Sequence, residues 1–293
     1  MKISDLGSDF LRDKSRYGEW RKARLSVCPQ NVEEIIVPID GLLSVSAAGI
    51  AAIKTACKRA NMAIYQCRDP SVSRAAVASF AREFGLTTLD HHLCANADGV
   101  AELSVASEGV RTDYVPYSNR SLSWHTDGYY NDRDRQINAV VLHCARAAAS
   151  GGENALLDPD MAYIRLRDEN PQFITAFEHP DCMTIPANMG AEGEIRPASS
   201  GPVFSYGARG EIHMRYSARK KNILWRDDAL TTAARDFLTH ILNDKDAPVF
   251  HYRLRAGEGL ISNNVLHNRT EFSDGLGQQR LLYRARFFER IEI

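Results

Sequence analysis

The spacing of hydrophobic and polar positions divides the chain near residue 100. Before that point, short apolar runs alternate with segments in which apolar residues recur every three or four positions, a pattern typical of strands alternating with helices. It predicts four elements: a strand over 35–39, a helix from Ser44 or Ser46 to about Arg59, a strand over 62–67, and a helix from Ser71 or Ser73 to Gly85. Residues 1–30 are polar, and we expect them to be irregular and anchored by Tyr17, Trp20 and Leu25.

After residue 100, apolar runs bounded by glycine turns dominate. They predict strands over 137–144, 151–158 (after a tight turn), 203–206, 211–216, 249–254, 260–266 and 280–290. The run over 137–144 is dense enough in apolar residues to predict burial on both faces. Capping residues predict three helices in this part: 159–169, from Pro171 to about 178, and from Asp227 and Asp228 to about 243.

Many strands and few helices predict a mainly β fold with flanking helices. A double-stranded β-helix (jelly roll) core is one such fold, and its open end commonly holds a metal. The pattern contains no linker and no repeat. We therefore expect one domain over 1–293, in which an N-terminal α/β part (1–100) packs on a jelly-roll core (101–293).

Composition narrows the class of protein. The 36 basic and 37 acidic residues leave a formal net charge of −1, and no basic stripe indicates a nucleic-acid partner. No stretch approaches the roughly 18 apolar residues of a membrane span, and the first residues do not resemble a signal peptide. The six cysteines are scattered without a CxxC pair, as in proteins of reducing compartments. We expect a cytoplasmic protein that acts on a small molecule, and leave open whether it forms homo-oligomers.

The stretch over 122–130 carries the strongest chemical signal. His125 stands two positions before Asp127, so on a strand or at its exit both side chains point the same way. A third ligand is needed, and His267 is the best candidate downstream. Two histidines and one carboxylate with open positions form the facial triad of non-haem Fe(II) oxygenases. A second such pair, His179 and Asp181, has a proline between its members and is interpreted as a helix end.

The same residues occur in a longer arrangement. His125 and Asp127 are followed by a Gly-Gly-Glu-Asn turn ending at Asn154, then by His267 and Arg280. In this spacing they resemble the taurine dioxygenase (TauD/TfdA) and γ-butyrobetaine hydroxylase family of Fe(II)- and 2-oxoglutarate-dependent oxygenases. The resemblance implies Fe(II) bound by the two histidines and Asp127, with O2 and 2-oxoglutarate as cosubstrates. It also implies hydroxylation of a substrate with release of succinate and carbon dioxide.

The resemblance covers about 114–288 and suggests further roles. Arg280 matches the arginine that grips the distal carboxylate of 2-oxoglutarate, a task suited to a guanidinium fork. Asn154 matches the position after the Gly-Gly turn where the family usually has a hydroxyl or amide that helps to hold 2-oxoglutarate. Asp127 itself argues against the related halogenases, which have a small residue at its position. Two outcomes are consistent with the resemblance: hydroxylation alone, and hydroxylation followed by fragmentation of the product.

The candidate substrate-binding residues indicate two different charges on the substrate. Tyr117 matches a tyrosine of a trimethylammonium cage, and Trp124 and Tyr129 lie near it in sequence, where aromatic faces attract cations. Gly128 departs from the second cage tyrosine, so the cage is incomplete. Arg284 matches an arginine that faces anionic groups in taurine dioxygenase-like members, and we also place it among the cofactor-binding residues. A small charged or zwitterionic metabolite satisfies both signals.

Other interpretations are weighed against this one. A non-catalytic, cupin-like metal sensor or binding protein would keep the ligands but has no need of Arg280. A zinc hydrolase would favour an HExxH or cysteine-containing ligand set, which is absent from the sequence. Other histidines receive structural interpretations. His143, His213 and His251 lie in predicted strands and are interpreted as structural. His91 and His92 are interpreted as part of an exposed loop.

Overall fold

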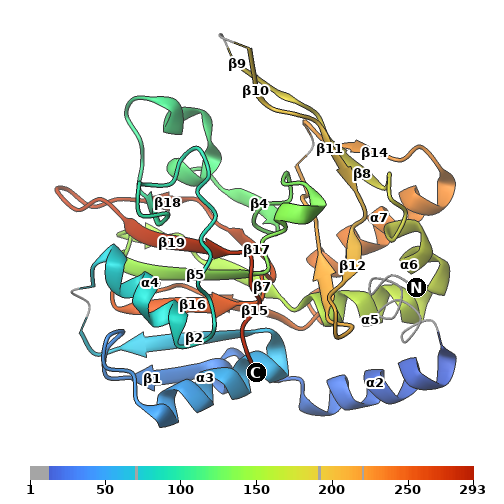
Figure 1. Cartoon of the computed structure of the whole chain (residues 1–293), viewed down its shortest axis with the longest axis horizontal. Coiled ribbons are helices and arrows are strands. Elements are labelled where there is room, and N and C mark those ends of the chain that lie inside the picture. Colours follow the sequence, from blue (N-terminus) through green and yellow to red (C-terminus); the bar gives the residue numbers. More distant parts are fainter. Residues whose placement is uncertain (1–12, 70–71, 191–192, 220) are drawn as a thin grey trace. The chain divides into compact units, whose positions relative to one another are not determined.

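The computed structural model describes residues 13–69, 72–190, 193–219 and 221–293 (Figure 1). They form two compact units, each assembled from separate stretches of chain. The first, which we call the sheet unit, comprises Pro29–Asp127, Ile137–Leu156 and Phe250–Ile293. The second, the helical unit, comprises Gly128–Gln136, Leu157–Val249 and the described part of Met1–Cys28. A single domain over 1–293 stays a prediction, but residues 1–100 do not all belong to one unit.

The sheet unit holds two sheets and one short strand pair. In hydrogen-bonded order the larger sheet contains β1 (Ile36–Ile39), β2 (Met62–Cys67), β16 (Glu258–Ser262), β5 (Ala139–Arg146), β19 (Leu281–Phe287) and β3 (Ala101–Leu103). The smaller contains β15 (Val249–Tyr252), β7 (Asn154–Leu157), β17 (Leu266–Arg269) and β4 (Leu122–His125). The short pair is β18 (Phe272–Ser273) with β6 (Ser150–Gly151).

The N-terminal strands extend the larger sheet. β1 pairs in parallel with β2, and β2 pairs antiparallel with β16, so this segment supplies strands to the sheet as well as covering it. Two helices complete the segment: α3 (Ala47–Ala60) packs on β1 and β2, and α4 (Arg74–Arg82) packs on β5 and β19 (Figure 1). Short 3-10 turns accompany them: η1 (Val32–Ile35), η2 (Val110–Asp113) and η3 (Val115–Tyr117).

Serine caps place both helices. The side chain of Ser46 accepts a hydrogen bond from the backbone N–H of Gly49, and that of Ser73 accepts one from Ala76. Ser71, the alternative cap for the second helix, lies outside the described residues. The helices and the sheet share one apolar core, in which Phe80 of α4 lies against Tyr65 of β2.

The helical unit contains four α-helices and several short strands in the part of the chain that is described. The helices are α2 (Lys14–Val27), α5 (Pro159–Glu169), α6 (Pro171–Phe177) and α7 (Ala229–Asn243), with the short turn η4 (Arg133–Arg135). The strands are β8 (Met183–Ile185), β9 (Asn188–Gly190), β10 (Gly193–Arg196), β11 (Ser199–Gly201), β12 (Phe204–Tyr206), β13 (Ile212–Met214) and β14 (Leu224–Trp225).

Helix α2 corrects the expectation that residues 1–30 are irregular. Asp13 caps the helix by accepting hydrogen bonds from two backbone N–H groups, and Tyr17 is buried. Tyr17 and Trp20 do anchor the segment, because both rings contact Tyr163 of α5. Leu25 does not, since it is 39% exposed. Residues 1–12 of the predicted stretch lie outside the described residues.

The coarse fold class is confirmed: the described chain consists mainly of strands with flanking helices. Strand β5 is also buried along most of its length on both faces, as its apolar density predicted. No helix among the described residues is long and apolar enough to cross a membrane.

Candidate metal centre

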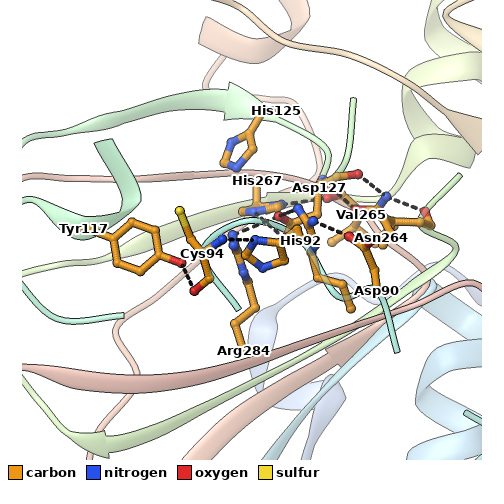
Figure 2. A network of polar contacts seen from close by, with 12 residues as sticks. Asp90, His92, Cys94, Tyr117, His125, Asp127, Asn264, Val265, His267 and Arg284 are labelled. Atoms are coloured by element: carbon orange, nitrogen blue, oxygen red, sulfur yellow. Dashed lines mark hydrogen bonds and ion pairs between the residues drawn. The ribbon is translucent and has the colours of Figure 1, made fainter. Parts of the chain in front are cut away.

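Strand pairing brings the two predicted histidine ligands together. His125 is the last residue of β4, His267 is the second residue of β17, and the register places them opposite each other. Their ring centroids are 4.2 Å apart. Asp127 follows two positions after the end of β4, and its Oδ2 lies 3.9 Å from Nε2 of His267. His267, distant in sequence, therefore forms one cluster with His125 and Asp127 within the sheet unit (Figure 2).

Hydrogen bonds set the tautomers of both imidazoles. Nδ1 of His125 lies 2.9 Å from the carbonyl oxygen of Ser123, and Nδ1 of His267 lies 2.9 Å from that of Val265. A carbonyl only accepts, so each Nδ1 carries the proton and donates it. Each Nε2 is then left with its lone pair, which is the form that binds a metal.

The carboxylate of Asp127 is held from one side only. Its Oδ1 accepts a hydrogen bond of 2.9 Å from Arg284, whereas its buried Oδ2 has no hydrogen-bond partner among the described residues. The backbone is clamped by Asn264, whose side chain accepts from the N–H of Asp127 at 2.8 Å and donates to its carbonyl at 2.9 Å. A buried carboxylate oxygen without a partner is costly unless a cation fills the place.

Protonation states at this cluster suit metal binding. Burial, followed by the neighbouring His267, lowers the pKa of His125 to about 3. Burial alone would raise the pKa of Asp127, but Arg284 and Arg286 outweigh it and hold the pKa well below its ordinary value. At neutral pH the cluster thus offers a neutral imidazole and an ionised carboxylate, the states that metal ligands need.

The cluster is not arranged as a finished coordination sphere. In the described part of the chain, no group of three or more His, Cys, Asp or Glu side chains has the geometry to hold a metal ion as it stands. Its donor set nevertheless fits a divalent ion of the iron type, because two Nε2 lone pairs and one uncovered carboxylate oxygen share a small space. We conclude that the residues fit the metal, with Asp127 turned partly toward Arg284.

A pocket joins the cluster to the predicted cosubstrate residues. It is lined by His125, Asp127, His267, Asn154, Arg280 and Arg284, together with apolar side chains from β5, β16 and β19. The alternation of strand side chains explains the lining: Leu282 and Arg284 of β19 line the pocket, whereas the intervening Tyr283 and the following Ala285 do not.

Arg280 is a buried cation whose charged end is uncommitted. Its side chain is 5% exposed, and its guanidinium lies 4.8 Å from the ring centre of Phe272 but forms no hydrogen bond or ion pair with a described residue. Burial lowers its pKa to about 10, so the group stays charged at neutral pH. Asn154 is buried beside the pocket, where Nδ2 donates to the carbonyl of Asn268 at 2.9 Å and Oδ1 has no partner among described residues.

The predicted substrate residues are less closely grouped. Tyr117 is buried, its hydroxyl donates to the carbonyl of Cys94 at 3.2 Å, and its ring lies under the guanidinium of Arg111 (Figure 2). Neither Tyr117 nor Trp124 is among the residues that line the pocket. Tyr129 belongs to the helical unit, where its hydroxyl accepts a hydrogen bond from Arg219 at 3.2 Å.

Three further residues lie at the cluster without having been predicted there: Asn264, Asp90 and His92. The pair of asparagines before His267 is a turn signal that could have pointed to Asn264, which adopts a φ of 51°. His91 is exposed as expected, but His92 is only half-exposed and lies beside Arg284 (Figure 2). Burial and the nearby guanidinium groups lower the pKa of His92 to about 2.

Comparison with known proteins identifies the family. The model of the taurine catabolism dioxygenase TauD, TfdA family matches residues 37–286, which is most of the chain. The chain belongs to this family. The resemblance inferred from the sequence is thus confirmed at the level of the family.

Individual relatives are more distant. A uridine-5'-phosphate dioxygenase from an Amycolatopsis species is 29% identical over 175 residues, which are 57% of this chain and 60% of that protein. Among solved structures, an asparagine oxygenase in complex with Fe(II), 3-hydroxyasparagine and succinate is 16% identical, with a TM-score of 0.56 over 86% of this chain and 93% of the other. The non-haem iron oxygenase OrfP with Fe and α-ketoglutaric acid is 15% identical, with a TM-score of 0.61 over 84% and 81%. These two show similarity of fold.

Proposed function

We propose that the protein is an Fe(II)- and 2-oxoglutarate-dependent oxygenase that hydroxylates a small charged or zwitterionic metabolite and releases succinate and carbon dioxide. The observation that carries the proposal is the shared pocket. It combines two imidazoles whose Nδ1 atoms donate to backbone carbonyls, so that each Nε2 carries the lone pair. It also holds a carboxylate oxygen without a hydrogen-bond partner among the described residues and the buried guanidinium of Arg280. Membership of the TauD/TfdA family supports the same reading.

In this proposal each residue has a defined task. His125, Asp127 and His267 hold Fe(II), which when bound supplies the chemistry that activates O2 with 2-oxoglutarate as reductant. Arg280 binds the distal carboxylate of 2-oxoglutarate, and Asn154 lines the same pocket. The apolar side chains of Leu142, Leu156 and their neighbours exclude water from the reacting atoms.

The finer statements about fold and location belong to the same proposal. We take the two sheets of the sheet unit to be the two halves of a jelly roll, with the pocket residues drawn from strands of both. A cytoplasmic location fits the scattered cysteines of the sequence. The fold similarity to structures that contain Fe with succinate or with 2-oxoglutarate is compatible with these statements.

The substrate is proposed from charge. Arg284 lines the pocket next to the metal cluster and favours an anionic group, so carboxylates, sulfonates and phosphates are preferred over neutral compounds. The relative that acts on uridine-5'-phosphate adds a nucleoside monophosphate to the candidates. A group that binds a cationic part of the substrate is proposed from Tyr117 and Trp124, which belong to the sheet unit but do not line the pocket.

The test is substrate-dependent succinate formation. Purified protein would be loaded with Fe(II) without oxygen and given 2-oxoglutarate, which should produce a weak visible charge-transfer band. Air and a panel of small betaines, amino acids, aminosulfonates and uridine-5'-phosphate would then be added. We expect at least one charged compound to raise succinate release above the uncoupled rate, whereas neutral sterols and peptides do not.

Variants separate this function from its rivals. His125→Ala, Asp127→Ala and His267→Ala should each lose iron and turnover, whereas His251→Ala, an exposed histidine outside the pocket, should keep both. A non-catalytic metal-binding protein would bind Fe(II) but form neither the band nor succinate. If the triple ligand variant still consumed 2-oxoglutarate, the metal centre would be wrongly assigned.

A further inference from the structure

The carboxylate of Asp127 faces two arginines. Nη1 of Arg284 lies 2.9 Å and Nη1 of Arg286 lies 3.6 Å from the same oxygen, Oδ1. The other oxygen, Oδ2, has no hydrogen-bond partner among described residues and lies on the side of His267. The family resemblance gives a role to Arg284 but none to Arg286. The second arginine therefore requires its own explanation.

Arg286 is more deeply buried than Arg284 and also pairs with a second carboxylate, that of Asp90. Its side chain is 2% exposed, and its Nη2 donates to the carboxylate of Asp90, which is also 2% exposed. The two residues meet through the backbone as well, because the N–H of Asp90 donates to the carbonyl of Arg286 at 2.9 Å. Strand β19 presents both arginines on one face, since residues 284 and 286 are two apart.

With a single arginine beside it, the carboxylate of Asp127 could adopt two orientations, with either one or both oxygens bound to the guanidinium. A guanidinium and a carboxylate prefer a bidentate arrangement, in which both oxygens accept hydrogen bonds. With Arg284 alone, Asp127 could turn until Oδ2 was also engaged, and no oxygen would then face the metal. A second guanidinium 3.6 Å from Oδ1, itself paired with Asp90, attracts the charge on that oxygen and opposes the rotation. Asn264 restrains the backbone of Asp127 but not the rotation of its carboxylate.

We propose that Arg286, fixed by its buried pair with Asp90, is a positioning residue that holds Oδ1 of Asp127 and keeps Oδ2 free for the metal. The inference rests on the metal centre of the proposed function. Asp90 neutralises the charge of Arg286, so the pair adds no net charge beside the metal centre. Its proposed effect is to orient the carboxylate of Asp127. Arg286 touches neither substrate nor cosubstrate in this role.

This charge balance determines the experiment. The double variant Asp90→Asn/Arg286→Met removes the pair without changing the net charge near Asp127, so any change in metal binding reports on position. The probe is Co(II) added to the metal-free protein, followed by its visible absorption spectrum. We expect about 10- to 100-fold weaker Co(II) binding, the range found when residues that support metal ligands are replaced. We also expect a changed Co(II) band, which a general loss of stability would not produce.

Two further variants keep the test decisive. In the helical unit, Arg24 forms buried pairs with Asp158 and Asp160 at 2.7 and 2.8 Å. The matched variant Arg24→Met/Asp160→Asn should therefore lower stability but leave Co(II) affinity and spectrum unchanged. If the first double variant does not fold, Arg286→Lys keeps the charge but loses the fork, and should give an intermediate loss of affinity.

The outcomes distinguish this inference from the proposed function. Wild-type Co(II) affinity and spectrum in a folded Asp90→Asn/Arg286→Met or Arg286→Lys protein would overturn the role of Arg286 alone. If Asp127→Ala also bound Co(II) as tightly as wild type, the metal centre itself would be wrong and both proposals would fall. Weakened binding in the Asp127 and Arg286 variants, with an unaffected Arg24 variant, supports both.

Discussion

Each imidazole at the candidate metal centre is oriented by its own strand. His125 donates to the carbonyl two residues before it, at Ser123, and His267 does the same to Val265. Both acceptors are backbone atoms of the same extended segment, so the side chains at those two positions are not needed for the contact. The orientation of a ligand histidine is thus encoded locally, unlike that of Asp127, which depends on Asn264 and on arginines of a distant strand.

Arg280 gives the first prediction. Arg280→Ala should raise the 2-oxoglutarate concentration needed for half-saturation roughly 10- to 150-fold, because a lost charge-assisted hydrogen bond is worth about 1.5–3 kcal/mol. Iron binding should be nearly unchanged, since Arg280 is not among the proposed ligands. Arg280→Lys should recover part of the loss, because a lysine offers charge without the fork. The measurement is succinate formation as a function of 2-oxoglutarate concentration.

The control for this prediction is Arg255→Ala, which removes a largely exposed arginine paired with Glu258. It should leave the 2-oxoglutarate requirement at the wild-type value. An unchanged requirement in Arg280→Ala would mean that another arginine, with Arg284 first in line, binds the distal carboxylate.

Some residues of the site can be predicted from the sequence and others cannot, for a physical reason. His125, Asp127 and His267 stand in a spacing that metal chemistry itself explains, and the structure clusters them. Asp90 and Asn264 act through contacts across 196 and 137 positions of sequence, respectively. No local pattern encodes such a contact. Their roles depend on which strands become neighbours, and the apolar pattern predicts strands without predicting their order.

At the scale of elements, helices with a strong cap were the most predictable. Ser46 and Ser73 begin α3 and α4, and prolines stand at the first position of α5 and α6. Helix α2 was missed because it is mostly polar and buries only Tyr17, so it has no apolar stripe that a sequence pattern could reveal. The short strands β8 to β11 have no sequence signal because three or four residues are too few to show a period.

The cap of α3 supplies a second prediction. Ser46→Ala removes the side-chain oxygen that accepts from the N–H of Gly49 at 3.1 Å, and should lower the free energy of unfolding by about 1 kcal/mol. Ser44→Ala, two residues earlier and outside the cap, should change it little. Urea denaturation of both variants is the measurement. Equal losses in the two would mean that Ser46 does not cap the helix.

A glycine in β16 supplies the third prediction. Gly259 lies between β2 and β5, and a Cβ there would come within 2.2 Å of the Tyr65 ring and 2.5 Å of the Leu142 carbonyl. Gly259→Ala should therefore destabilise the protein by about 1–3 kcal/mol or more through overpacking.

The matched change has the opposite sign. Gly18 lies inside helix α2 with nothing within 4 Å of its would-be Cβ. Gly18→Ala should raise stability by about 0.5–1 kcal/mol, because alanine loses less conformational entropy in a helix. Thermal unfolding of the two variants beside wild type compares them directly. A neutral Gly259→Ala would show that β2 and β5 can separate at that point.

At the scale of the whole molecule, stability should depend on pH through buried histidines. His143 of β5 is fully buried, stacks on Tyr65 and lies 3.2 Å from its hydroxyl, and burial lowers its pKa from 6.5 to about 4. The unfolded chain takes up a proton near pH 6.5 that the folded chain refuses. Stability is therefore complete above pH 6.5 and falls as the pH drops from 6.5 to 4, by roughly 3 kcal/mol from this residue.

The variant that checks this is His143→Phe. It should be less stable than wild type at pH 7, because the Tyr65 hydroxyl loses its partner, but its stability should fall less steeply between pH 6.5 and 4. Some slope should remain from His125, whose pKa is also lowered by burial. His251→Ala, which alters an exposed histidine, should keep the wild-type slope. A wild-type slope in His143→Phe would assign the acid sensitivity to other groups.

Strand β19 follows the other strands of the larger sheet in sequence yet lies inside that sheet, between β5 and β3. A nascent chain that has emerged only to β17 already carries both histidines and Asp127, but none of the arginines at 280, 284 and 286. Until β19 arrives, β5 and β3 each present an open edge, which is the feature that invites pairing with another chain. Translation stalled in this interval should therefore give an aggregation-prone intermediate. Chaperones that shield strand edges would be most needed between the synthesis of β17 and that of β19.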